Sequence, residues 1–169
     1  MERQDYFWQL DADVAFRPGQ VDRMIELGVD VVSGMYPQKD PDKILPTIHA
    51  VPKGEADERG LIQCTGLPGG FLFIKADVLL TMCRMYKSLL FTTFDELDSY
   101  AFWSGIVAPW PGRKGKFLYH GEDFAFTHRL HKAGFKLYAD LKTSIAHCFD
   151  EIMLEFAWGD TPAQFKEPS

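Results

Sequence analysis

Apolar and polar positions along the chain alternate with strand and helix periods. Residues 6–11 form a short apolar and aromatic run, which is typical of a buried strand. Residues 18–28 place apolar side chains at helical spacing, with Pro18 in the first turn and Gly28 as the stop. Residues 29–36 are rich in β-branched side chains and predict a second strand. A strand, a helix and a strand at this spacing predict a βαβ unit, and such units build parallel or mixed sheets.

The rest of the chain continues the alternation, with two irregular interruptions. Residues 37–60 are polar, and we expect a long surface excursion there with a short strand at 47–51. Residues 87–120 have no clean period and are rich in aromatic rings. The other elements expected are strands at 71–74, 135–140 and 143–149, helices at 76–86 and 122–133, and a weak amphipathic helix carrying Ile152, Met153 and Phe156.

The composition limits the classes of protein that fit. A chain of 169 residues with 46% hydrophobic and 25% charged residues is expected to fold as one globular domain. The net charge of −6 argues against a general nucleic-acid binder, which would present a basic face. Cys64, Cys83 and Cys148 form no metal or disulfide pattern, so we expect reduced thiols and a cytoplasmic location. No apolar run approaches the roughly 20 residues of a membrane span.

The first strand ends in two carboxylates, Asp11 and Asp13, which are one residue apart. Residues i and i+2 of an extended strand point to the same side, so the two side chains are expected to project together. Like charges this close repel, and a hard divalent cation with oxygen ligands would relieve the repulsion. A solvated turn, or an aspartate cap for the following helix, explains the same residues equally well.

Three further places carry candidate chemistry, each with a plain alternative. Gly69 and Gly70 precede a predicted strand and would let the backbone approach a ligand, although a simple turn fits as well. Glu122 and Asp123 open a predicted helix, where acidic residues also suit the helix dipole. His147 lies at a strand end, where a lone histidine is more often structural than a metal ligand.

Taken in this order, the motifs resemble the metal-dependent glycosyltransferases of the GT-A fold, nearest to the family 2-like enzymes. The matching stretches are residues 10–13, 69–73, 121–134, 137–140 and His147. The resemblance implies an α/β fold class, with a mixed, mainly parallel sheet flanked by helices, like the C-terminal part of a GT-A domain. It also implies a partial catalytic domain over residues 1–149, followed by a tail with a short helix over residues 150–169.

A metal site follows from the resemblance. Asp13 would ligate Mn²⁺ or Mg²⁺, Asp11 would contact the metal or the ribose of the donor, and His147 would be a further metal ligand. Imidazole suits Mn²⁺ better than Mg²⁺. The metal would hold the diphosphate of a nucleotide-sugar and stabilise negative charge as the leaving group departs.

The resemblance assigns the remaining roles around the donor sugar. Asp123 would be the general base that takes the proton of the acceptor hydroxyl, as in inverting members. Glu122 would hydrogen-bond the sugar or the acceptor. Gly69 and Gly70 would supply backbone contacts beside the donor.

The function implied is therefore enzymatic: transfer of a sugar from a nucleotide-sugar to a hydroxyl acceptor. A non-catalytic carbohydrate- or metal-binding module and a nucleotide-sugar hydrolase are the alternatives. Enzymes of this kind normally have several β-α units before the Asp-x-Asp strand, whereas only residues 1–5 precede it here. We therefore expect a fragment, a partner that supplies the missing half, or a remnant that is inactive alone because it cannot bind nucleotide normally. We also expect association into an oligomer through the unpaired part of the sheet.

Overall fold

One six-stranded sheet forms the centre of the molecule. The computed structural model describes residues 5–39, 45–52, 54–110, 112–149 and 152–154. From edge to edge, the strands are β1 (Tyr6–Leu10), β6 (Phe71–Lys75), β3 (Val31–Met35), β11 (Leu137–Ser144), β5 (Leu61–Gly66) and β4 (His49–Ala50). The sequence predicts strands at β1, β6, β3 and β4 and misses β5, whose six residues alternate between buried and exposed positions only in part. β11 runs through residues 141 and 142, where the sequence predicts a break between two strands.

The sheet is mixed and mainly antiparallel, so the expected mainly parallel sheet is wrong. Of the neighbouring strands, only β3 and β11 run parallel, and the other pairs are antiparallel. β1 and β3 do run in the same direction on either side of a helix, as a βαβ unit requires. However, β6 inserts between them and pairs antiparallel with both. Strand residues also outnumber helix residues among those described, so the protein is richer in strand than an α/β domain flanked by helices.

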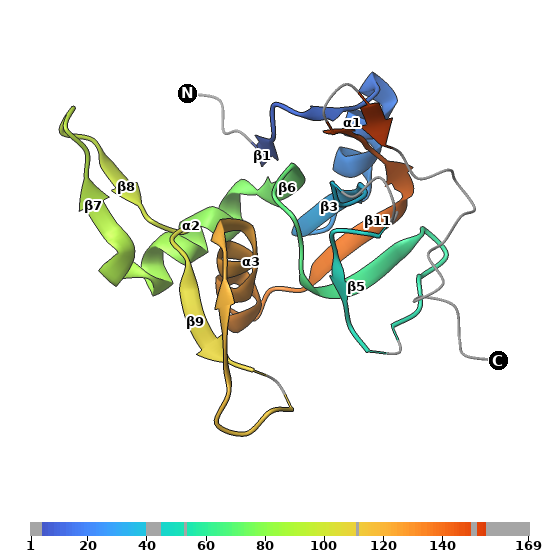
Figure 1. The fold of residues 1–169 in the computed structure, drawn as a ribbon. Coiled ribbons are helices and arrows are strands. Elements are labelled where there is room, and N and C mark those ends of the chain that lie inside the picture. Colours follow the sequence, from blue (N-terminus) through green and yellow to red (C-terminus); the bar gives the residue numbers. More distant parts are fainter. Residues whose placement is uncertain (1–4, 40–44, 53, 111, 150–151, 155–169) are drawn as a thin grey trace.

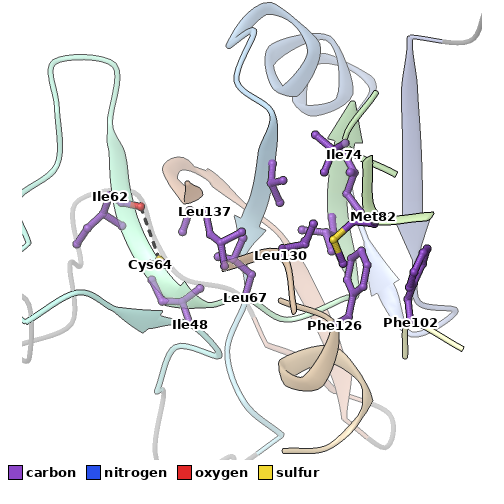
Figure 2. Close-up of a cluster of buried hydrophobic side chains, with 14 of the residues drawn as sticks. Ile48, Ile62, Cys64, Leu67, Ile74, Met82, Phe102, Phe126, Leu130 and Leu137 are labelled. Carbon is purple, nitrogen blue, oxygen red and sulfur yellow. Dashed lines mark hydrogen bonds between the residues drawn. The ribbon is translucent and has the colours of Figure 1, made fainter. Parts of the chain in front are cut away.

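Helices cover both faces of the sheet (Figure 1). α2 (Ala76–Met85) and α3 (Glu122–Lys132) contribute Met82 and Leu130 to one apolar cluster, which Figure 2 shows against the inner side chains of the strands. α1 (Pro18–Glu26) contributes Met24 to a second cluster on the other face. Successive residues of a strand point to opposite faces. Leu72 and Phe73 accordingly belong to different clusters, and β6 is buried on both sides.

An ion pair fastens α1 to the sheet. The Arg23 guanidinium donates two hydrogen bonds to the Asp140 carboxylate of β11, at 2.6 and 2.7 Å. The Asp140 side chain is fully buried and also accepts a hydrogen bond from the Thr143 hydroxyl at 2.6 Å. Breaking one partner of such a buried pair is costly, because it leaves a desolvated charge without compensation. This pair therefore fixes the position of α1 over β3 and β11.

Residues 87–120, which lack a clean period, form two hairpins. A short 3₁₀ turn, η1 (Lys87–Leu89), leads into β7 (Leu90–Thr92) and β8 (Asp98–Tyr100). β9 (Ile106–Pro109) and β10 (Phe117–His120) make the second hairpin. The β7–β8 hairpin projects away from the central sheet, whereas the β9–β10 hairpin runs beside α3 and only its turn extends beyond the helix (Figure 1).

A small three-stranded sheet closes the described part of the chain. β12 (Ala146–Phe149) lies between β2 (Val14–Ala15) and β13 (Ile152–Leu154) and pairs antiparallel with both. Ile152 and Met153 therefore lie in a strand, and not in the helix expected for the tail, while Phe156 lies outside the described residues. No helix among the described residues is long and apolar enough to cross a membrane.

We expect Gly34→Ala to destabilise the fold, because β3 has no room for a methyl group at this position. A Cβ at Gly34 would lie 2.8 Å from Phe71 Cδ1 and 2.9 Å from Ile145 Cγ1, and all three residues are buried. Overpacking of this kind costs about 1–3 kcal/mol. Gly19→Ala is the control, because nothing lies within 4 Å of a Cβ there. Urea unfolding of both variants is the measurement, and equal stabilities would contradict the packing described.

Candidate functional site

The sequence-predicted site residues meet at one rim of the central sheet. Beyond the last residue of β1, the Asp11 amide donates to the Gly70 carbonyl at 3.1 Å, which places Asp11 beside the entry to β6. Two residues later, the Asp13 carbonyl accepts a hydrogen bond from the Cys148 amide at 2.8 Å. This bond and the pairing of β2 with β12 place His147 next to Asp13. Backbone hydrogen bonds thus join the segment around Asp11 and Asp13 to two segments that are distant from it in the sequence.

Gly70 allows the backbone of β6 to come close to two polar side chains. Its amide donates to the Tyr36 hydroxyl at 2.7 Å. A Cβ at Gly70 would lie 2.9 Å from Asp11 Oδ2 and would also collide with the Tyr36 hydroxyl. Tyr36 is buried, and burial raises the pKa of its hydroxyl, which is therefore neutral. The glycine is required here for space and not for an unusual backbone angle.

Gly69 has the same function for the carboxylate of Asp123. A Cβ at Gly69 would overlap both the Asp123 carboxylate and the Gln9 side-chain amide. Gln9 Nε2 donates to Asp123 Oδ1 at 3.5 Å, and the backbone of Gly69 also hydrogen-bonds this carboxylate. Asp123 lies in the first turn of α3, so the start of this helix is held directly against β1 and β6.

Asp13 is held between a lysine and a histidine. Lys39 Nζ donates to Asp13 Oδ2, and His147 Nε2 lies 3.7 Å from Asp13 Oδ1. His147 Nδ1 lies 2.8 Å from the Pro37 carbonyl oxygen. A carbonyl oxygen only accepts, so Nδ1 carries a proton. Nε2 then faces the carboxylate, either with the lone pair of a neutral ring or as the N–H donor of an imidazolium.

Electrostatics separates the carboxylates of the rim into two kinds. The hydrogen bond from Lys39 lowers the pKa of Asp13, and the same bond raises the pKa of the lysine. Burial raises the pKa of Asp11, and repulsion from Asp13 raises it further. Burial also raises the pKa of Asp123, and repulsion from the charges of Asp11 and Glu122 raises it further. Asp13 is therefore the most readily ionised of the three aspartates, and Asp123 holds a proton more readily than an exposed aspartate.

A buried arginine supports the side of the site that faces Asp123. Arg129 of α3 donates to the carbonyls of Phe102 and Ser104, at 2.6 and 2.7 Å. These bonds hold the loop that carries Trp103, whose indole N–H donates to Gln9 Oε1 at 2.8 Å. Gln9 in turn donates to Asp123. The orientation of the Asp123 carboxylate therefore depends on contacts that lead from Arg129, on the same helix α3, through Trp103 to Gln9.

Asp13 and His147 lie close enough to each other to bind one small divalent cation together. Two atoms that each bind one such ion at about 2.1 Å lie within roughly 4.2 Å of each other. The 3.7 Å between Asp13 Oδ1 and His147 Nε2 satisfies this condition. The bond from His147 Nδ1 to the Pro37 carbonyl is the outer contact that metal-bound histidines commonly make. As placed, however, the described side chains form no group of three or more His, Cys, Asp or Glu residues that could hold a metal.

The structure thus brings together Asp11, Asp13 and His147, and it places Gly69, Gly70 and Asp123 beside them. Glu122 is exposed at the start of α3 and lies near enough to raise the pKa of both Asp11 and Asp123. The sequence argument misses four residues of the rim. They are Gln9, Tyr36, Lys39 and Trp103. Of these four, only Gln9 could have been predicted from the sequence. It lies two residues before Asp11, so in an extended strand its side chain points to the same side as those of Asp11 and Asp13.

Comparison with known proteins identifies no family. No protein-family model matches the chain, and no curated protein matches it. Among solved structures, the crystal structure of A197 from STIV is similar, with 18% sequence identity and a TM-score of 0.46. The alignment covers 90% of this chain and 66% of that one, so this chain spans just under two thirds of the length of A197. At this level of similarity, the likeness carries no argument about function.

We expect Asp123→Asn to stabilise the protein at neutral pH by less than about 1 kcal/mol, because solvent still reaches the site and screens the charge. The pKa of Asp123 is raised in the folded state. Between the unfolded and the folded pKa, the folded state therefore binds more protons, and stability falls as the pH rises. The stability that Asp123→Asn adds should therefore shrink as the pH falls from the folded to the unfolded pKa of Asp123, because the wild-type carboxyl group is then protonated and carries no charge.

Urea unfolding at pH 7 and at pH 3.5 measures this difference. Asp22→Asn is the control, because Asp22 is an exposed residue of α1 outside the rim. A variant at Asp123 that is less stable than the wild type at pH 7, or whose gain is the same at both pH values, would contradict the electrostatic description.

Proposed function

We propose that this protein carries a metal-dependent glycosyl-transfer site, which moves a sugar from a nucleotide-sugar to a hydroxyl acceptor. The observation that supports the proposal best is the meeting of Asp13 and His147 with Asp11 and Asp123 at one rim. The segments that carry them are widely separated in sequence. Ordinary turn or capping residues have no reason to gather in this way, since carboxylates repel one another.

Asp13 and His147 are the residues that would hold the metal, with Asp11 beside them. When bound, a divalent cation supplies charge neutralisation for the departing nucleoside diphosphate. Asp13 suits this role because Oδ1 of its carboxylate lies 3.7 Å from His147 Nε2. His147 suits it because the Pro37 carbonyl holds its Nδ1 and leaves Nε2 facing Asp13. Lys39 neutralises Asp13 in the structure described and would have to leave the carboxylate for a metal to bind there.

Asp123 is the residue that would act as the general base. Its carboxylate would take the proton of the acceptor hydroxyl while the hydroxyl oxygen forms a bond to the anomeric carbon of the donor. The bond from that carbon to the diphosphate oxygen breaks in the same step, and the electron pair leaves with the diphosphate. A raised pKa makes a carboxylate a better base near neutral pH. Gln9 and the backbone of Gly69 orient the carboxylate for this reaction.

Gly69, Gly70 and Glu122 are the remaining residues that would surround the donor sugar in this reaction. Gly69 and Gly70 are buried and leave no side chain between the backbone of β6 and the carboxylates. The side chains of Asp123, Gln9, Tyr36 and Asp11 fill the space beside this backbone, so a donor sugar would contact it only after these side chains move. Glu122 is exposed at the mouth of the site, where it would hydrogen-bond the sugar or the acceptor.

The proposal is tested by release of nucleoside diphosphate from a panel of nucleotide-sugars, with Mn²⁺ present and with and without hydroxyl acceptors. We expect acceptor-dependent release by the wild-type chain. Asp123→Asn is expected to lower the rate at least about 100-fold, as the loss of a general base commonly does. Asp13→Ala should abolish activity, whereas Asp22→Asn on α1 should leave it unchanged.

The same assay separates the alternatives. Release of free sugar at the full rate without any acceptor would favour a hydrolase. Nucleotide-sugar binding that Asp123→Asn leaves intact, with no turnover of any donor by the wild-type chain, would favour a binding module. Either result would contradict the proposed transfer.

A further inference from the structure

The hairpin β9–β10 has an exposed face that is entirely apolar. Val107 pairs directly with Tyr119, and Pro109 pairs directly with Phe117. Directly paired residues of two antiparallel strands lie on the same face, so these four side chains form one continuous strip. The exposed fractions are 68% for Val107, 64% for Phe117 and 68% for Tyr119, and Pro109 is exposed as well. The exposed fractions make the strip accessible to a partner, and the turn of the hairpin extends beyond α3 (Figure 1).

The far end of this hairpin is strongly basic. The Arg113 guanidinium lies 4.1 Å from the centre of the Trp110 ring, and Lys114 and Lys116 are exposed beside it. Residues 106–120 contain these three cations and no acidic residue, although the whole chain has a net charge of −6. Trp110 is itself 37% exposed. An aromatic and apolar strip thus ends in a cluster of positive charge on an otherwise acidic protein.

We propose that the β9–β10 hairpin docks the protein onto the surface of an anionic lipid bilayer. Aromatic rings and short apolar strips insert at the level of the lipid headgroups, where their polar atoms stay hydrated. Lysine and arginine side chains beside them attract anionic headgroups. The acidic body is repelled by the same surface, so the hairpin is the part of the chain that approaches it. This proposal does not depend on the proposed transferase activity.

The hairpin β7–β8 provides a natural comparison within the same chain. It also exposes large apolar side chains, including Phe91 at 46% and Phe94 at 108%. It carries Asp95, Glu96 and Asp98 where the other hairpin carries cations. An anionic bilayer would repel this hairpin, whereas the basic hairpin of a second copy would attract it. Self-association is therefore the main competing explanation for the exposed strip, and the experiment must distinguish the two.

The test is flotation of the full chain with vesicles of phosphatidylcholine alone and of phosphatidylcholine with 30% phosphatidylglycerol. We expect binding to the anionic vesicles only, and loss of binding at high salt, which screens exposed charges. Each cation near such a surface contributes about fivefold to the affinity, so Lys114→Ala with Lys116→Ala should weaken binding roughly 25-fold. Phe117→Ser with Tyr119→Ser should also weaken it, because the apolar contact is lost.

Two matched controls complete the experiment. Lys132→Ala with Lys136→Ala removes the same charge elsewhere on the exposed surface, and Phe91→Ser with Phe94→Ser removes two rings from the acidic hairpin. Both controls should bind anionic vesicles like the wild type. Failure of the wild type to float with anionic vesicles, or equal losses in variants and controls, would overturn the proposal. A salt-sensitive dimer that is lost in the Lys114 and Lys116 variant, without vesicle binding, would assign the strip to a second copy.

Discussion

Repulsion between carboxylates gathered at one rim is the constraint on which the site depends. Burial and mutual repulsion raise the pKa of Asp11 and Asp123, so both are costly to ionise. Asp13 behaves in the opposite way, because the Lys39 ammonium donates to it and lowers its pKa. The rim is therefore stable only where positive charge or protons compensate it.

The backbone makes this concentration of charge possible. β6 inserts between β1 and β3 and enters the sheet through Gly69 and Gly70. Because these residues lack side chains, the carboxylates of Asp11 and Asp123 come close to the same stretch of backbone from two different elements. β6, which makes two of the four antiparallel pairs of the sheet, is thus also the strand that builds the site. Arg129 and Trp103 extend this support from α3 to Gln9.

The sequence predicts the local parts of this arrangement better than their connections. The ends of β1 and α1 follow from short patterns, and Gly28 and Gly134 adopt the positive φ values, 65° and 91°, that suit a helix stop. Periodicity does not say which strands pair, and the antiparallel pairing of β6 and β5 with their neighbours makes the expected mainly parallel sheet wrong. The same limit hides Tyr36 and Trp103, whose roles arise only from contacts with distant residues.

Binding of Mn²⁺, measured by isothermal titration calorimetry, tests the central claim most directly. The account predicts one saturable site in the wild-type chain, and Asp13→Ala should remove it. Lys39→Met should tighten binding, because the ammonium group that competes for the Asp13 carboxylate is gone. No saturable binding to the wild-type chain or to the Lys39 variant, or equal affinities with and without the Asp13 carboxylate, would contradict the account.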